Sequence, residues 1–242
     1  MQRVLVTTSW DDGHSADLRV AELLAAHGLK GTFYIAFNHP NAKEITDHEI
    51  RTVYRMGMEI GSHTLTHRLL TGRAGTDVRY ELSESKMRLE DILGAPITAF
   101  SYPQGAFTAV ARAALVETGY RVGRSTAAFR FAYDFDPLLM PISVEFCRHS
   151  RIAITRHAVR DGNLAGLMNW ARIARLEVDP LSLGRLIFDR VFALGGVFHL
   201  NARSWEIDRN ELWRDLQAML HHIAKNPGIS HLTNSEVLPP RH

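Results

Sequence analysis

The sequence predicts an α/β protein whose core is a mostly parallel β-sheet, closed or nearly closed into a barrel. Two observations support this fold class. Segments with strand character alternate with segments whose apolar residues recur at the helical period, which is the pattern of a parallel sheet covered by helices. The 242 residues contain no visible linker, repeat or low-complexity tract, and one large α/β domain accommodates that length. Residues 1–242 are therefore expected to form a single domain.

In the first half of the chain, each expected strand is followed by an expected helix. A first strand begins at Val4, and β-branched and aromatic residues favour another at 32–37. Thr46 and Glu49 form a capping box, which predicts that a helix starts there. The remaining expected strands are 58–62, 98–102 and 121–126, and the remaining expected helices are 17–27, 76–93 and 108–118.

The second half of the chain is less regular. A strand is expected at 139–145, helices at 163–176 and 181–194, and a strand at 197–200 after two glycines. Residues 148–157 show no firm period, and the stretch 147–179 is a candidate lid or subunit contact. A last helix is expected to start at Asp208, with Glu211 three residues on, and to bury Leu212, Leu216, Leu220 and Ile223. This helix and a strand would fill residues 208–238.

Composition excludes several classes of function. The formal net charge is only +2, so nothing favours binding to nucleic acid or to an acidic membrane. Cys147 is the one cysteine, so no disulfide framework marks a secreted protein. No apolar run is long enough to span a bilayer, and Met1-Gln2-Arg3 leads into the first strand without a signal-peptide pattern. We therefore expect a cytoplasmic protein without membrane insertion. The sequence does not determine the oligomeric state, and a homo-oligomer is one possibility.

Two adjacent acids, Asp11 and Asp12, follow the first strand. Asp-Asp-Gly is also a good turn sequence, and an aspartate there can cap the next helix. The functional interpretation is that the two side chains leave the strand end in different directions. One carboxylate would then bind a metal ion while the other stays free as a base.

Two histidines, His63 and His67, follow the strand expected at 58–62. Imidazoles four residues apart in a helical turn can share one metal ion. With 13 histidines in the chain, such a pair also arises by chance. The position at a strand's carboxyl end favours the metal.

Two weaker signals also stand at strand ends. The loop Tyr102-Pro-Gln-Gly105 follows the strand at 98–102, and His199 lies in the strand at 197–200. Taken alone, the loop is better explained as a turn, and His199 as a histidine of the core. Active sites of α/β barrels gather at the carboxyl ends of the strands, so four such groups together predict a hydrolytic site.

In this order, Asp-Asp-Gly, His-Thr-x-x-His, Tyr-Pro-x-Gly and a late-strand histidine resemble the motifs of the NodB-homology domain, the family 4 carbohydrate esterases. The resemblance covers residues 4–206. It implies a distorted (β/α) barrel that hydrolyses amide C–N bonds by removing acetyl groups from amino sugars. The implied cofactor is Zn²⁺, or another divalent ion such as Co²⁺, Ni²⁺ or Mn²⁺.

The resemblance also implies roles for individual residues. Asp12, His63 and His67 resemble the metal ligands, Asp11 the general base that takes a proton from the attacking water, and His199 the general acid for the leaving amine. Backbone N–H groups of the loop from Tyr102, above all that of Gln104, would stabilise the oxyanion. Thr64 would steady the histidine loop by hydrogen bonding.

The sequence departs from the family pattern at two places. Ser101 stands where an arginine usually pairs with the base. We hypothesise that Arg124 supplies that charge from the next strand; the alternative is a surface arginine. The Asp-rich fourth motif is missing unless Asp134 and Asp136 supply it, and a solvated turn is the other interpretation. Trp205 offers a face on which a sugar ring could stack, or it belongs to the core.

The leading hypothesis is deacetylation of a small-molecule or oligosaccharide substrate, a soluble nucleotide-linked or lipid-linked amino sugar in particular. A second hypothesis keeps the fold and opens a cyclic amide or imide, as allantoinase-like relatives do. A third is a carbohydrate-binding relative without turnover. Intact Asp11, Asp12, His63, His67 and His199 argue against the third.

Overall fold

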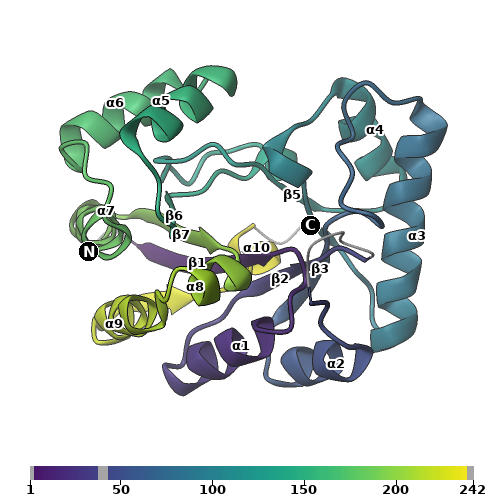
Figure 1. The fold of residues 1–242 in the computed structure, drawn as a ribbon, viewed down its shortest axis with the longest axis horizontal. Helices are drawn as coiled ribbons and strands as arrows, with labels where there is room; N and C mark the ends of the chain where they lie inside the picture. The colour runs from purple at the N-terminus through teal and green to yellow at the C-terminus, as the bar shows by residue number, and fades with distance from the viewer. Residues whose placement is uncertain (1–2, 38–42, 239–242) are drawn as a thin grey trace.

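A curled parallel sheet forms the centre of the computed structural model, which describes residues 3–37 and 43–238 (Figure 1). The strand order is β5-β4-β3-β2-β1-β7-β6, and β8 pairs with the beginning of β1. Met1 and Gln2, on which the expected location partly rests, lie outside the described residues. The strands are β1 (Val4–Asp11), β2 (Thr32–Ile35), β3 (Glu59–Ser62), β4 (Ala99–Ser101), β5 (Val122–Arg124), β6 (Val144–Glu145), β7 (Gly196–Ala202) and β8 (Ile229–His231).

Every pairing between these strands is parallel, as the sequence predicts. The sheet curls into a half-barrel, and β5 and β6 stand at its two ends. The irregular segment between them spans the gap: Met140 bridges to Arg124, and Ser143 donates its N–H to the carbonyl of His199 at 2.8 Å. The barrel is therefore nearly closed, but the strand expected at 139–145 shortens to β6.

Helices surround the sheet on its outer side (Figure 1). All eight residues of β1 are buried because β2, β7 and β8 flank it and helices cover it. The helices are α1 (Asp17–Ala26), α2 (Asp47–Arg55), α3 (Gly75–Leu93), α4 (Ala109–Glu117), α5 (Arg151–Arg160), α6 (Leu164–Ile173), α7 (Pro180–Leu194), α8 (Ser204–Arg209), α9 (Trp213–Ala224) and α10 (Asn234–Val237). Across residues 3–37 and 43–238, no helix combines the length and apolar character needed to cross a membrane.

Local sequence signals explain most helix boundaries. The capping box of Thr46 and Glu49 is present at the start of α2. The stretch without a firm period overlaps α5, in which the buried residues are Ile154 and Ala158. Such a helix has too narrow an apolar face to give a periodic signal.

The expected start of the last long helix is wrong. Asp208 lies in α8, Glu211 has a positive φ of 56°, and α9 begins at Trp213. The expected core positions of that helix are nonetheless buried, because they follow from apolar spacing rather than from the cap. These are Leu212, Leu216, Leu220 and Ile223.

Candidate metal centre and active site

Asp12, His63 and His67 converge at the carboxyl edge of the sheet. Oδ1 of Asp12 lies 3.5 Å from Nε2 of His63 and 3.2 Å from Nε2 of His67. Ligand atoms around a tetrahedral zinc ion stand roughly 3.3–3.8 Å apart, given bonds of about 2.0–2.3 Å. Among the described residues, the buried Oδ1 of Asp12 has no hydrogen-bond partner, so it is available to a cation. The three residues thus fit a divalent metal ion.

The turn after β1 separates the two acids. Asp11 is the last residue of the strand, and Asp12 (φ 82°) and Gly13 (φ 69°) turn the chain through the left-handed region, which aspartate tolerates better than most residues. The indole Nε1 of Trp205 donates to Oδ2 of Asp12 at 2.8 Å. Oδ1 is thereby left to face the histidines, and Asp11 points elsewhere.

The main chain of β4 orients His63. Nδ1 of His63 donates to the carbonyl oxygen of Ser101 at 2.8 Å, so the proton sits on Nδ1 and the lone pair of Nε2 faces Asp12. Residues 63–67 form a loop rather than the expected helical turn, and Thr64 and His67 have positive φ.

The histidine loop is held by a residue other than the predicted one. The buried hydroxyl of Thr64 has no hydrogen-bond partner within the described residues, so its expected role is wrong. Instead, Glu81 of α3 accepts hydrogen bonds from the hydroxyl and the N–H of Thr66, at 2.7 and 3.0 Å. A buried carboxylate with two such bonds fixes the loop between the two ligands.

Arg124 pairs with Asp11 inside the sheet. Its Nη2 contacts both carboxylate oxygens of Asp11 and donates to the hydroxyl of Ser101 at 2.6 Å. Ser101 and Arg124 are register partners on β4 and β5, so a small residue at 101 leaves room for the arginine to reach across. Burial raises the pKa of Asp11, but Arg124, His63 and Arg203 together outweigh burial, and the pKa lies below its usual range.

His199 does not fit the general acid that the resemblance implies. Its ring is 1% exposed, and it is absent from the residues that line the hollow over the metal ligands. Nδ1 donates to the carbonyl of Pro141 at 2.9 Å, so Nε2 accepts from the hydroxyl of Ser9 at 2.8 Å. Burial first, and then the charge of Arg124, lower the pKa of His199 to about 3. The buried, neutral imidazole of His199 therefore has a structural role.

Asn201 lies next to Asp11, a contact that the sequence alone did not predict. It is the register partner of Ser9, and its Nδ2 donates to Oδ2 of Asp11 at 3.3 Å and to the hydroxyl of Ser9 at 3.2 Å. Hydrogen bonds connect His199 to Asp11 through Ser9 and Asn201. The period of two along β7, which puts residues 199 and 201 on one face, was the signal that could have found it.

Tyr102, Gln104 and Trp205 line a hollow of about 180 Å³ together with the ligands and Asp11. Gln104 stands in the left-handed region at φ 54°. The N–H of Tyr102 donates to the carbonyl of Arg124 at 3.1 Å and is committed to the sheet, so it is not an oxyanion donor. Gln104 remains the candidate donor. Because Trp205 donates a hydrogen bond to Asp12, its indole does more than pack in the core.

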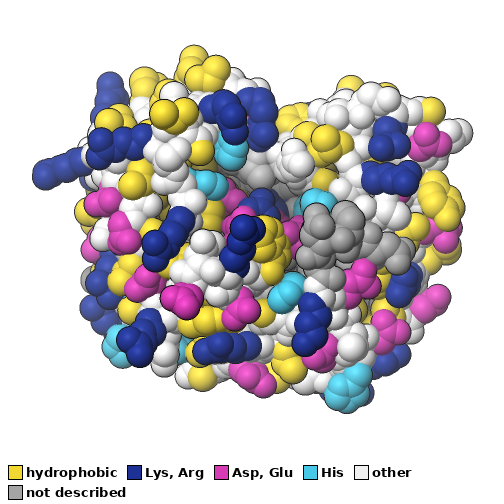
Figure 2. Space-filling model, viewed as in Figure 1, with side chains coloured by type: hydrophobic (Ala, Val, Ile, Leu, Met, Phe, Trp, Pro, Cys, Tyr) yellow, Lys and Arg dark blue, Asp and Glu magenta, His cyan; other side chains and the backbone are white. Residues whose placement is uncertain are grey.

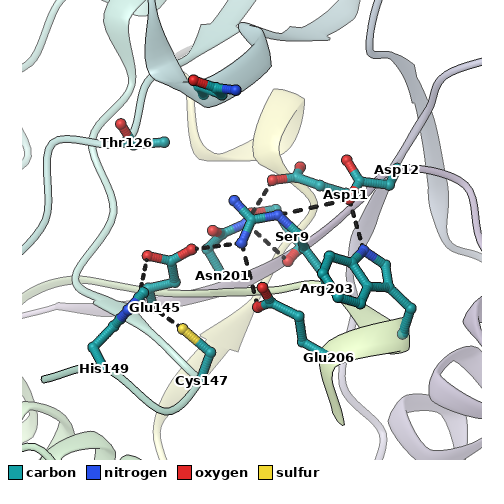
Figure 3. A network of polar contacts seen from close by, with 12 residues as sticks. Ser9, Asp11, Asp12, Thr126, Glu145, Cys147, His149, Asn201, Arg203 and Glu206 are labelled. Atoms are coloured by element: carbon teal, nitrogen blue, oxygen red, sulfur yellow. Dashed lines mark hydrogen bonds and ion pairs between the residues drawn. The ribbon is translucent and has the colours of Figure 1, made fainter. Parts of the chain in front are cut away.

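Arg203 is a second residue to which the sequence assigned no individual role. Its Nε lies 3.6 Å from Oδ2 of Asp12, and its Nη1 lies 3.0 Å from Glu145 and 3.3 Å from Glu206. Figure 3 shows its guanidinium between these carboxylates. Asp134 and Asp136 are exposed and absent from the hollow, as the interpretation of a solvated turn expects.

The polysaccharide deacetylase family model matches residues 2–123. The match covers just over half of the 242 residues and includes both acids, both histidines and the 102–105 loop. The chain belongs to the polysaccharide deacetylase family. The resemblance to the NodB-homology domain is thereby confirmed, and the motif order explains how it was visible.

Two curated relatives in this family are similar over part of their length. The Bacillus subtilis protein YxkH, whose name assigns it to the polysaccharide deacetylases, is 29% identical over 125 residues, 51% of this chain and 44% of its own. A chitin deacetylase of Arthroderma benhamiae is 28% identical over 148 residues, 58% of this chain and 38% of its own. The chain therefore spans less than half the length of these relatives.

Solved structures share the fold. A Mycobacterium smegmatis protein described as a polysaccharide deacetylase has a TM-score of 0.66 at 14% identity, over 98% of this chain and 89% of its own. A family 4 carbohydrate esterase from Streptomyces lividans, solved with acetate, has a TM-score of 0.55 at 17% identity, over 93% and 90%. A Bacillus anthracis pseudoenzyme of the same esterase family has a TM-score of 0.55 at 13% identity, over 97% and 65%. At these identities the likeness shows the fold alone.

Proposed function

We propose that this chain is a metal-dependent hydrolase of amide C–N bonds that removes the acetyl group from an N-acetylated amino sugar. One observation carries the proposal: Asp12, His63 and His67 offer three converging ligand atoms, and a separate buried carboxylate, Asp11, lines the same hollow. Figure 2 shows this face of the molecule hollowed near its middle, with acidic, basic and histidine side chains around the opening.

Two imidazoles and one carboxylate suit Zn²⁺, with Co²⁺, Ni²⁺ or Mn²⁺ as alternatives, and leave coordination positions for small ligands. When bound, a divalent ion polarises a carbonyl and makes water more acidic. The protein contributes the orientation. The proton on Nδ1 of His63 is fixed by Ser101, and Oδ2 of Asp12 is occupied by Trp205.

Asp11 serves as the base in this proposal. Arg124 and Asn201 hold its carboxylate in place and keep it ionised, so it can accept the proton of the attacking water. Because the pKa of Asp11 is low, it is a weak base, and the acidity that a metal gives to water must make up the difference. With His199 enclosed, we assign the return of that proton to the departing amine to Asp11 as well.

The hollow also has features for binding a sugar. The loop at Gln104 faces the ligands with a polar rim, and Trp205 gives an aromatic surface at its edge. Chitin and other polysaccharides are named in the descriptions of the relatives, and an N-acetylated amino sugar shares their reacting group. The cytoplasmic location stays a prediction, and it favours a soluble nucleotide-linked or lipid-linked substrate.

One observation favours a second candidate. Without an accessible histidine acid, the fold could bind carbohydrate without turning it over, as a pseudoenzyme does. The ionised Asp11 beside the ligand cluster argues for turnover. A cyclic amide or imide remains the alternative substrate class, and allantoin represents it in the assay.

The test is release of acetate from a panel of N-acetylated amino sugars and their oligomers, with allantoin and a cyclic imide beside them. We expect chelation to abolish activity and Zn²⁺ or Co²⁺ to restore it. The double variant Asp12→Ala, His63→Ala should lose one equivalent of metal and all turnover. If the fully metallated protein binds the sugars and hydrolyses nothing in the panel, the second candidate replaces the first.

A further inference from the structure

A second group of metal-ligating side chains lies outside the site described so far. Glu145 is the last residue of β6, and Cys147 and His149 follow at spacings of two. The chain bends at Cys147, shortly after β6, and the bend brings the three side chains together. Their ligand atoms all lie within 4.8 Å of one another, and Figure 3 shows the three side chains turned toward each other.

A single ring nitrogen of His149 meets both of the other side chains, and its one proton cannot make a full hydrogen bond to each. Nε2 of His149 lies 2.8 Å from Sγ of Cys147 and 2.9 Å from Oε2 of Glu145. An imidazole nitrogen offers either one proton or one lone pair. A Cys–His–acid catalytic triad would put sulfur and carboxylate on opposite ring nitrogens, whereas here both crowd the same one. Three donors around one point are the arrangement that a cation produces.

The surrounding charges also suit a cation. Glu145 and Glu206 contribute two carboxylates and Arg203 one positive charge. Burial raises the pKa of the Cys147 thiol. A divalent ion would balance the negative charge that thiolate formation adds.

The cluster faces a cavity rather than closed core. Glu145, Cys147 and His149 line a cavity of about 290 Å³ whose walls include Phe129, Ile154 and Leu183. Arg203, Gln104 and Thr126 line both this cavity and the hollow over Asp12, so the two spaces adjoin. A cation held by three protein ligands here would have an open position toward a space large enough for a small molecule.

We propose that Glu145, Cys147 and His149 form a second metal site, separate from Asp12, His63 and His67, that takes Zn²⁺ or a similarly thiophilic divalent ion. Sulfur and imidazole ligands select against Mg²⁺ and Ca²⁺. On binding, the S–H bond of Cys147 breaks, its proton passes to solvent and a sulfur–metal bond forms, with no change of oxidation state. Ligand atoms around zinc lie roughly 3.3–3.8 Å apart, so Sγ and Nε2 must separate by less than about 1 Å.

Co²⁺ is the probe, because thiolate ligation gives an intense near-ultraviolet charge-transfer band that histidine and carboxylate ligands do not give. Cys147 is the one cysteine in the chain, so such a band identifies this site without ambiguity. We expect the wild-type protein, kept reduced, to bind two equivalents of Co²⁺ and to show the band. Saturation with Co²⁺ without the band would overturn the proposal on the wild-type protein alone.

Variants separate the two sites. Cys147→Ser and His149→Gln should each lose the band and one equivalent of metal, with an unchanged circular dichroism spectrum. The double variant Asp12→Ala, His63→Ala should lose the other equivalent and keep the band. His157→Ala is the matched control, since His157 lines the same cavity and its ring packs against His149 at 5.9 Å between centroids. If that control loses the band as well, His157 belongs to the ligand set and the three-residue assignment is wrong.

Discussion

Arg124 contacts Asp11 from the strand next to Ser101, the position from which the family's motif arginine would reach the same carboxylate. Asp11 thus has an arginine partner on β5, the strand next to the one that carries Ser101. Both side chains are buried, with Arg124 0% exposed. In such a place an unpaired charge is strongly destabilising, so each residue depends on the other.

Replacing Arg124 tests this dependence. Arg124→Met should lower kcat by about 10²-fold or more, because Asp11 loses the charge that orients and ionises it. Bound metal should stay unchanged. The stability loss should be about 3–5 kcal/mol in urea unfolding, the usual cost of breaking a buried pair. Arg124→Lys, which retains the positive charge without the planar guanidinium group, should recover part of the activity. Turnover equal to wild type in Arg124→Met would refute the assignment.

Substitution should distinguish the roles of the two adjacent acids, Asp11 and Asp12. Asp11→Asn should retain every equivalent of metal and lose turnover by about 10³-fold, because the base is removed and the ligands are intact. Asp12→Asn should lose metal at the first site, and adding excess Zn²⁺ should restore part of its activity. Metal analysis and acetate release on the same preparations give both readouts. Loss of metal in Asp11→Asn would show that the assignment of the two acids is reversed.

Trp205 should act on the metal through Asp12. Trp205→Phe keeps an aromatic face and removes the 2.8 Å hydrogen bond to Oδ2. Loss of a hydrogen bond to a ligand typically weakens metal affinity about 10- to 100-fold. Competition with a chelator measures this affinity, and substrate KM reports stacking separately. An unchanged affinity in Trp205→Phe, with KM raised only in Trp205→Ala, would reduce the indole to a stacking surface.

His199 predicts an acid-sensitive fold. Its pKa is about 3 in the folded protein and about 6.5 unfolded, so below pH 6.5 the unfolded chain binds the proton that the folded chain refuses. Stability from this residue is therefore present above about pH 6.5 and is lost as the pH falls toward 3. At pH 4.5 the loss is roughly 2–3 kcal/mol.

Comparing wild type with His199→Gln in urea unfolding at pH 7.5 and 4.5 checks this prediction. The variant should be less stable at pH 7.5, and the gap should narrow at pH 4.5. Measurable turnover in the variant, at a reduced level, would agree with a structural part. A gap that is equal at both values would show that the imidazole is not excluded from protonation.

The convergence of Asp12, His63 and His67 could be predicted from the sequence, since Asp12 and His63 follow directly on strand ends. Asp12 comes one residue after β1 and His63 one residue after β3, and parallel strands bring their carboxyl ends to one edge. The capping box at Thr46 and the apolar spacing of α9 are likewise local signals, and both describe the structure correctly.

What the sequence leaves open depends on contacts between distant segments. Whether Arg124 lies at the surface or against Asp11 is decided by the register of β4 and β5, which no local pattern states. His199 and Asn201 share one face of β7, and the register of β1 and β7, which sets Asn201 opposite Ser9 and His199 opposite Thr7, brings Asn201 to Asp11. Arg203 has no motif at all, and its place follows from the start of α8 after β7.

Ser101 joins both halves of the centre, but through different atoms. Its carbonyl oxygen orients His63, and its hydroxyl meets Arg124 and Asp11. Every amino acid has that carbonyl, so exchanging the residue at 101 alters the surroundings of the base while the imidazole keeps its tautomer. The arginine that pairs with Asp11 can therefore stand on a different strand, and the pKa of Asp11 can change with it, while the orientation of His63 stays the same.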